Sequence, residues 1–327
     1  MACSAAVSKS VYYELVRYAT LAASSHNTQC WQFKITENGI SILPDLTRRC
    51  PVVDPDNHHL YVSLGCATEN LLIAAKTHGF KSVVKLQEEE NAVKVIHIHL
   101  TECAPVRSLL FEAIFERQSS RSNYDGRPLK TEDLRLLSCA GRREGVSLIL
   151  LTQRQAIEVI QDYVTRANTS QINDLAFKSE LKSWIRFNSS EAIQKGDGLF
   201  SKSTGNPAAP HWLGSLLFDF TFSARSENKK IAKQMRSSAG IAVFVSDKND
   251  PAHWIAVGRC YQRFALQAEL LDIRTALLNQ PVEVVAIRRE LARYLVIGDR
   301  RPDLLVRFGH GPKMPRSFRR PVDSVIV

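Results

Sequence analysis

The sequence lacks several features that would assign it to a common class. It has no run of eighteen apolar residues, so no membrane-spanning helix is expected. Its opening, MACSAAVSKS, has neither a basic leader nor a long apolar stretch, so no secretory signal is expected. No CxxC pair occurs among seven scattered cysteines, which favours a reducing cytoplasm over a disulfide framework or a zinc site. GxGxxG, Walker A, HExxH and partnered GxSxG motifs are also absent.

The 327 residues are 44% hydrophobic, which is enough for one large domain or two ordinary ones. The net charge of +10 favours phosphate-bearing partners. However, the basic residues form no long block, and the densest group, RSFRRP at 316–321, lacks the aromatic interleaving of single-strand binders. A basic nucleic-acid binder is therefore a minor hypothesis, and we predict no nucleic-acid or membrane partner.

Apolar periodicity and turn residues predict an α+β fold in which helices wrap antiparallel strands that form a central mixed sheet. One region, 189–238, is rich in Ser, Gly, Asn and Pro and is predicted to be a long loop, either a functional lid or a wrong assignment. The expected helices cover 10–21, 55–79, 153–166, 171–188 and 251–279; one more is marked by the apolar residues of 109–114 and runs into 116–129, and another begins at 131–137. The expected strands cover 31–45 (a hairpin with an Asn38-Gly39 turn), 81–86, 94–100, 146–151, 239–247 and 304–311.

The two long helices share a pattern. Segments 64–80 and 257–273 each have a glycine near the start and apolar pairs in the middle, and Pro55 and Pro251 precede them. This weak internal repeat predicts two related halves packed face to face, 1–104 and 105–327.

Two clusters of polar residues are candidates for a binding site. SSHNTQ at 24–29 precedes Trp31 and Phe33, which are expected in the core; the cluster itself is either a capping turn or a polar binding loop. RQSSR at 117–121 places two guanidiniums around two hydroxyls, which suits a phosphate or a solvated helix end. His97 and His99 share one face of a strand. They are either part of a polar strand face or a pair of metal ligands.

The segment AASSHNTQCWQF resembles the A-P-S-S-x-N-T-Q-P-W-x-F segment of flavin-dependent nitroreductases, and RQSSRSNY resembles the R-x-S-x-R-x-[FY] phosphate motif of that family. In ordinary members the phosphate motif comes first, and two subunits share each flavin. Here the order is inverted, and each half carries the motif that the other lacks. The chain therefore resembles the fused Acg-type branch, in which one chain imitates the dimer; further dimerisation stays open.

The resemblance implies FMN between the halves, with NADPH or NADH as the electron donor. Carried over by residue, RQSSR at 117–121, here called the second-half motif, would hold the phosphate, the ribityl chain and a ring oxygen. SSHNTQ at 24–29, here called the first-half loop, would touch the flavin from the other side. Arg117 is also the candidate to stabilise anionic reduced flavin. No catalytic side chain and no metal ligand is implied, and Cys30, which replaces the family's proline, is not read as a nucleophile. The implied cofactor-binding residues are Ser24, Ser25, Asn27, Gln29, Arg117, Ser119, Arg121 and Arg319 or Arg320.

By this resemblance the chain is an oxidoreductase that passes a hydride from a nicotinamide through flavin N5 to a nitroaromatic or quinone-like acceptor. The alternative is a non-catalytic FMN-binding protein in which the lid at 189–238 covers the flavin.

Overall fold

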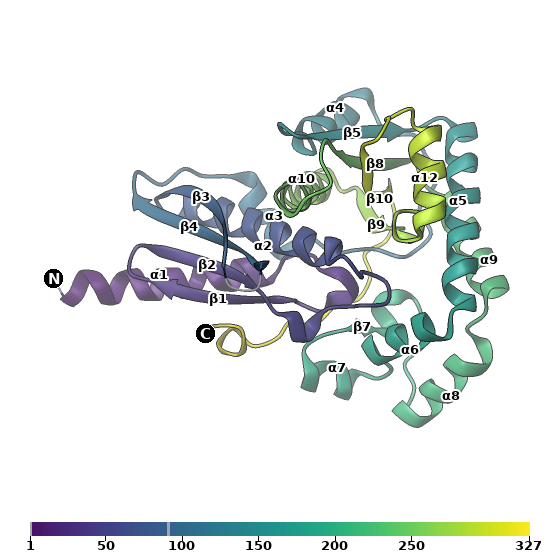
Figure 1. The fold of residues 1–327 in the computed structure, drawn as a ribbon, viewed down its shortest axis with the longest axis horizontal. Coiled ribbons are helices and arrows are strands. Elements are labelled where there is room, and N and C mark those ends of the chain that lie inside the picture. Colours follow the sequence, from purple (N-terminus) through teal and green to yellow (C-terminus); the bar gives the residue numbers. More distant parts are fainter. Residues whose placement is uncertain (1, 90–91) are drawn as a thin grey trace.

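The computed structural model describes residues 2–89 and 92–327, with side chains described from residue 10 onward apart from the same gap. Two four-stranded sheets lie on either side of a central helix pair (Figure 1). Neighbouring strands are antiparallel throughout both sheets. The expected α+β class is confirmed. The expected single mixed sheet is wrong, because β1–β4 pair only with one another and β5, β8, β9 and β10 form a separate antiparallel sheet.

The first sheet has the order β1-β2-β4-β3, and the second has the order β5-β8-β10-β9. In each sheet the first two strands along the chain are neighbours, a long helix follows, and the last strand returns to the middle. The first half comprises α1 (Ala2–Thr20), β1 (Trp31–Thr36), β2 (Gly39–Pro44), α2 (His58–Thr77), β3 (Phe80–Glu88) and β4 (Lys94–Glu102). The second comprises α3 (Leu109–Glu116), α4 (Thr131–Ala140), β5 (Val146–Leu151), β8 (Gly240–Ser246), α10 (Pro251–Leu270), β9 (Arg274–Leu277), α11 (Gln280–Glu283), α12 (Val285–Tyr294) and β10 (Arg301–Gly309).

Glycines allow α2 and α10 to cross closely at the centre. A Cβ on Gly65 would lie 2.1 Å from the carbonyl oxygen of Ile255, and a Cβ on Gly258 would lie 1.9 Å from that of Val62. The two contacts are reciprocal, since each glycine meets the residue three positions before the other glycine. Any side chain at either position would force the helices apart.

A helical insertion separates β5 from β8, where the first half has only the β1–β2 hairpin. It comprises α5 (Arg154–Asn173), α6 (Leu175–Trp184), β6 (Ile185–Arg186), α7 (Ser189–Lys195), β7 (Leu199–Phe200), α8 (His211–Thr221) and α9 (Ala224–Arg236). The expectation of a long loop over 189–238 is therefore wrong. Several of its polar residues are helix caps: the side chain of Asn188 accepts from the N–H of Glu191, and Ser223 forms a capping box with Ser226.

Two further expectations need correction. The predicted helix over 251–279 ends at Leu270, because Asp272 has a φ of 55° and the apolar residues after it form β9. Gly39 does not supply a turn with positive φ; it begins β2, and its Cβ would lie 2.0 Å from the carbonyl oxygen of Ile98. The hairpin loop is Glu37-Asn38, since Thr36 pairs with Gly39.

The C-terminal segment crosses back to the first half. The N–H of Phe33 donates to the carbonyl of Val325 (2.7 Å), and the N–H of Val327 donates to the carbonyl of Phe33 (2.9 Å). The tail therefore continues the edge of the first sheet beside β1 (Figure 1). This segment follows the second half in sequence but packs on the first.

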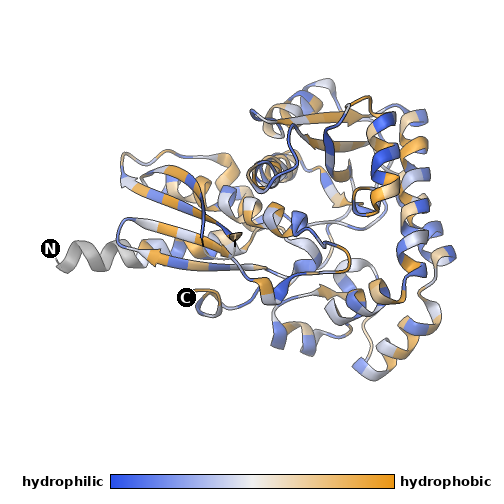
Figure 2. Ribbon diagram, in the orientation of Figure 1, coloured by the Kyte–Doolittle hydropathy of each residue, from blue (hydrophilic) through white to orange (hydrophobic). Residues whose placement is uncertain are grey.

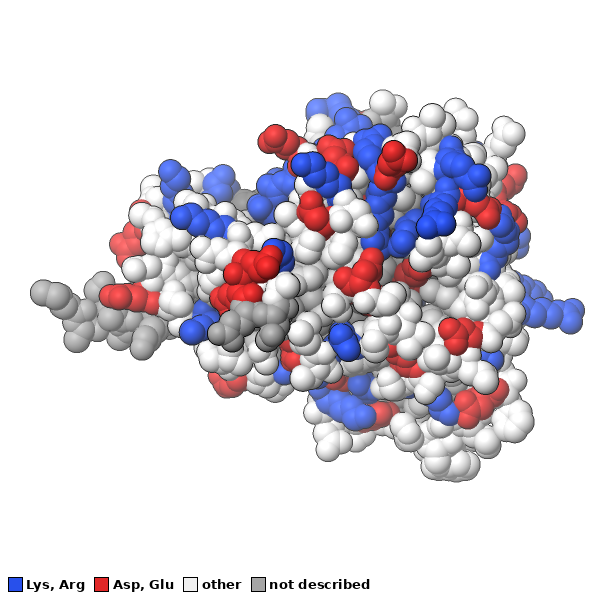
Figure 3. Space-filling view, viewed as in Figure 1, with Lys and Arg blue, Asp and Glu red and all other residues white. Residues whose placement is uncertain are grey.

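Apolar residues gather where the two sheets face the central helices, as Figure 2 shows by colour. Trp31 and Phe33 are fully buried there, as expected. Basic and acidic side chains are interspersed over the face drawn in Figure 3, with basic ones denser around the upper part. Within the described residues, no helix combines the length and apolar character needed to cross a bilayer.

Candidate functional site: a basic cavity between the halves

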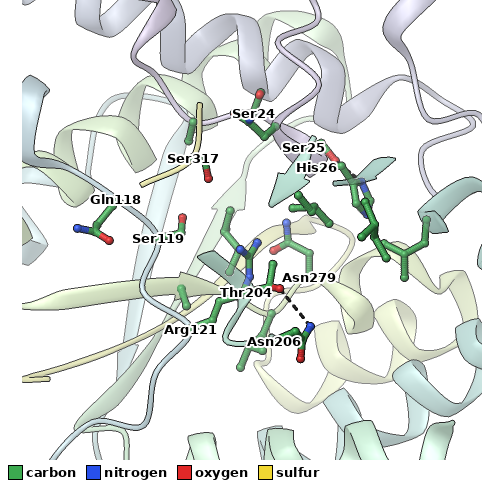
Figure 4. A pocket seen from close by; sticks show the side chains of 18 of the residues that line it. Ser24, Ser25, His26, Gln118, Ser119, Arg121, Thr204, Asn206, Asn279 and Ser317 are labelled. Carbon is green, nitrogen blue, oxygen red and sulfur yellow. Dashed lines mark hydrogen bonds between the residues drawn. The ribbon is translucent and has the colours of Figure 1, made fainter. Parts of the chain in front are cut away.

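A cavity of about 410 Å³ lies between the first-half loop and the second half. Ser24, Ser25 and His26 line one side, and Ser119 and Arg121 line the opposite side (Figure 4). The insertion contributes to the wall through Thr204 and Asn206, which hydrogen-bond to each other. The two polar clusters, 24–29 and 117–121, are far apart in sequence but share one cavity.

The first-half loop has an unusual backbone conformation. His26, Asn27 and Gln29 have φ values of 47°, 54° and 52°, a region that non-glycine residues occupy rarely and at a cost in energy. The fold holds this conformation by hydrogen bonds: the Oγ of Ser24 accepts from the N–H of Gln29 (3.0 Å), and the N–H of Ser25 donates to the Oγ of Ser63 on α2 (3.2 Å). Such strain is typical of functional loops.

The side chains of Asn27 and Gln29 hold the insertion and the tail. Asn27 Nδ2 donates to the carbonyl of Gly198 (3.1 Å), and Gln29 Nε2 donates to that of Gly196 (2.8 Å). The N–H of Gly198 returns a bond to the carbonyl of Asn27 (3.1 Å). Asn27 also lines the cavity, but Gln29 does not. The structure thus gives Gln29 a structural position and leaves its expected flavin contact without support.

Asp197 fixes the turn between α7 and β7 through ion pairs. Its carboxylate accepts from Arg186 Nε (2.9 Å) and Nη2 (2.7 Å) and also pairs with Arg48 from the first half. All these groups are largely buried. The insertion is therefore fastened to the first-half loop beside the cavity.

The second-half motif, RQSSR at 117–121, places cations in the cavity wall without acidic partners in the described part of the chain. Arg117 Nη2 donates to the carbonyl of Leu21 (3.2 Å), whereas its buried Nε has no partner among the same residues. The Arg121 guanidinium makes no hydrogen bond to another described residue, and burial lowers the pKa of Arg121. Ser119 lines the cavity next to them. Cations that are desolvated without a counter-charge favour an anionic ligand.

Arg319, on the C-terminal segment, also lines the cavity. Its Nε donates to the carbonyl of Thr20 and its Nη1 to Asn27 Oδ1, at 2.9 and 3.0 Å. Burial and the nearby charge of Arg117 lower the pKa of Arg319 to about 9. Arg320 does not line the cavity; its Nη2 donates to the carbonyl of Ser324 (2.8 Å). Of the two C-terminal candidates, Arg319 is the one at the cavity.

Sequence reasoning missed Arg307 on β10. This buried side chain lines the cavity, stacks 4.0 Å above the ring of Tyr124, and donates through Nη2 to the carbonyl of Ser122 (2.7 Å). Its Nη1 has no partner among the described residues. The available signal was the single arginine of the predicted strand 304–311, since a basic residue is rarely buried without a function or a partner.

The cavity lining also includes apolar and acidic residues. Phe177 and Leu181 of α6, Phe218 of α8 and Glu283 line it. His26, another lining residue, is neutral at pH 7, because burial and the charge of Arg121 lower its pKa to about 4. The cavity thus combines cationic side chains, suited to a phosphate, with apolar side chains, suited to a planar ring.

The remaining candidates lie elsewhere. His97 Nδ1 hydrogen-bonds to Ser41 Oγ (2.9 Å), and no metal-binding group of three side chains was found within residues 2–89 and 92–327. Cys30 is buried, and burial raises the pKa of its thiol to about 11, which disfavours the thiolate form. The side chain of Cys3 lies outside the described residues.

The structure thus has two four-stranded sheets of the same strand order and a cavity lined by both polar clusters. No family model matches the chain. The chain is 22% identical over 318 residues to a protein named "Putative NAD(P)H nitroreductase" in two Mycobacterium tuberculosis strains, H37Rv and CDC 1551/Oshkosh, covering 94% of this chain and 88% of each relative. This near full-length similarity supports the nitroreductase family, which the two motifs predicted.

Solved structures similar to this chain include nitroreductases with bound FMN. That of Bacteroides fragilis NCTC 9343 is 12% identical, covering 63% of this chain and 90% of that chain, with a TM-score of 0.40. That of Desulfitobacterium hafniense DCB-2 is 13% identical, covering 67% and 98%, with a TM-score of 0.39. Iodotyrosine deiodinase bound to FMN and 3-iodo-L-tyrosine is 11% identical, covering 65% and 95%, with a TM-score of 0.42. Similarity at this level carries no conclusion about the site.

Proposed function

We propose that this chain binds FMN in the cavity and acts as an NAD(P)H-dependent oxidoreductase on a quinone-like or nitroaromatic acceptor. The observation that carries the proposal is the set of buried and half-buried arginines that line the cavity without an acidic partner among the described residues. A phosphate with nearly two negative charges at pH 7 would supply the missing counter-charge. The names of the M. tuberculosis relatives support NAD(P)H as the electron donor.

In this proposal Arg117, Ser119 and Arg319 hold the phosphate, and Arg307 adds positive charge behind them. Arg121 has no hydrogen-bond partner within the described residues and would donate to the ligand itself, at the ribityl chain or a ring oxygen. Ser24 and Ser25 form the opposite wall, and the apolar side chains of α6 and α8 cover the ring. When bound, FMN supplies the hydride chemistry, while the chain binds it, orients it and excludes water.

We further propose that the chain consists of two fused half-repeats, with the division near residue 104. The equal strand order of the two sheets and the reciprocal glycine contacts of α2 and α10 support this. One half would supply the Ser-Asn loop, and the other half the phosphate motif. Membership of the Acg-type branch is part of the same proposal.

A second candidate function is FMN storage without turnover. The attachment of the insertion to the first-half loop through Gly196–Gly198 and Asp197 favours it, because a lid fixed over the ring would exclude a nicotinamide. Anaerobic addition of NADPH separates the two functions: bleaching of the flavin absorbance supports the oxidoreductase, and persistent colour supports storage.

The binding site is tested by Arg121→Ala, which removes a side chain that the fold itself does not use. Charge-assisted hydrogen bonds are worth about 1.5–3 kcal/mol, so FMN affinity should fall by roughly 10- to 150-fold while the unfolding midpoint of the apoprotein stays unchanged. The control is Arg127→Ala, since Arg127 is exposed and pairs only with Asp125. Equal FMN affinity in the two variants, measured by fluorescence titration, would refute the assignment.

A further inference from the structure

The lining of the cavity includes an unusual carboxyl group. Glu283 ends α11 and lines the cavity, with its side chain only 12% exposed. Its Oε2 accepts a hydrogen bond from Gln171 Nε2 on α5 (2.6 Å), and its Oε1 lies 3.5 Å from Nε2 of His59 on α2. Three separate elements thus fix the position of this carboxyl group.

No cation neutralises Glu283 among the described residues. Burial lowers the pKa of His59 to about 3, so this imidazole is neutral at pH 7. Asp54 and Glu180, the nearest charged groups from the first half and from α6, are both acidic. Burial, reinforced by these two carboxylates, raises the pKa of Glu283 to about 7.

The basic residues of the neighbouring elements are turned to other partners. Arg288 of α12 donates to the carbonyl of Val282 (3.0 Å), and Arg301 of β10 pairs with Asp56 (2.7 Å). The carboxyl group of Asp303 on β10 is bound to His58 (2.8 Å). Glu283 is therefore left as a protonatable carboxyl group in the cavity lining.

We propose that Glu283 is the proton donor to the acceptor during its reduction, an inference that rests on the proposed oxidoreductase function. Reduction of a quinone to a hydroquinone consumes one hydride and one proton. Bound FMN would supply the hydride, with NAD(P)H as the source of the two electrons. The O–H bond of the Glu283 carboxyl group breaks as an O–H bond forms on a quinone oxygen, and the carboxylate then regains a proton from water.

The surroundings suit this role. A general acid works best when its pKa lies near the working pH, and a carboxyl group reaches that range only when it is buried without a cation. The bond from Gln171 leaves the other oxygen, beside His59, free to carry the proton. Since the donor must be protonated, acceptor reduction should be fast below about pH 7 and should slow as the pH rises above it.

The test uses Glu283→Gln, which keeps the size and polarity of the side chain but removes the proton. FMN-loaded protein is first reduced anaerobically with NADPH and then mixed with menadione as the quinone probe. The variant should bleach at the wild-type rate, whereas its reoxidation by menadione should be about 100-fold slower and independent of pH between 5 and 9.

The control is Glu227→Gln, which removes a carboxylate from the α9 side of the same cavity. It should retain the pH dependence of reoxidation. A readout independent of flavin is the carboxyl ¹³C shift of glutamate-labelled apoprotein. One resonance should titrate near pH 7 in the wild type and in Glu227→Gln, and should be missing in Glu283→Gln.

The outcomes separate this inference from the proposed function. If wild-type protein is not bleached by NADPH, the oxidoreductase function fails, and the proton-donor role fails with it. If the wild type bleaches but Glu283→Gln reoxidises at the wild-type rate, the proton-donor role alone is overturned. An apoprotein without a glutamate resonance titrating near neutrality also overturns it.

Discussion

Replacing Asp197 with asparagine should release the insertion from the first-half loop. The carboxylate binds two arginines, Arg48 from the first half and Arg186 from the insertion, and its side chain is only 9% exposed. Asparagine has nearly the same shape but no charge. The variant therefore leaves two largely buried guanidiniums without their counter-ion and presents an amide N–H₂ to one of them.

Removing one partner of a buried ion pair costs about 3–5 kcal/mol. Here the cost applies to the closed state of the insertion, because opening exposes both arginines to water. About 1.4 kcal/mol corresponds to a factor of ten, so the equilibrium constant for closing of the insertion should fall by roughly 10²–10³. The bonds that Asn27 and Gln29 make to Gly198 and Gly196 remain, so the fold itself should persist.

Hydrogen exchange measures this directly, because the N–H of Gly198 is bonded to the carbonyl of Asn27 only in the closed state. Its protection in Asp197→Asn should fall by roughly two to three orders of magnitude, and FMN should dissociate faster. The control, Asp219→Asn, breaks an ion pair with Lys182 in the same insertion, but Asp219 is 56% exposed, so little change is expected. Equal protection in both variants would show that the Asp197 cluster does not hold the insertion.

Two further predictions concern the core. Gly65→Ala would place a Cβ 2.1 Å from the carbonyl of Ile255, so the helix pair must separate; we expect a loss of about 1–3 kcal/mol in urea unfolding, and an unchanged midpoint would contradict the close crossing. Iodoacetamide should label the exposed Cys103 and Cys139 of the native protein before Cys30 and Cys66, because burial raises the thiol pKa values of the last two to about 11 and 12. Peptide mass spectrometry checks the order, and early labelling of Cys30 would count against the packing of the first-half loop.

Local patterns predicted most of the elements well. The hairpin over 31–45, the strands near 81–86, 94–100 and 146–151, and the helix pair with early glycines all correspond to observed elements. Where prediction was wrong, the local signal was ambiguous. Residues 270–279 continue an apolar run that suits a helix or a strand, and the capping residues of α7 and α9 look like those of a loop.

The residues of the candidate site were likewise predicted only in part from the sequence. The types and spacing of Ser24, Ser25, Arg117, Ser119 and Arg121 singled them out in the sequence, and the structure brings them to one cavity. The positions of Arg307 and Glu283 could not be predicted in this way. Each is a single charged residue without a motif around it, and its importance comes from neighbours that are distant in sequence.

The sequence by itself determined which residues could hold an anion, because the donors of that motif lie within five positions of one another and need only local geometry. It also determined the close helix crossing, since only glycine tolerates a backbone at that distance. Only the tertiary structure decided which charges lack a partner, because pairing depends on contacts between segments far apart in the chain. The same long-range contacts attach the insertion through Asp197 and leave Glu283 as an acid buried without a cation.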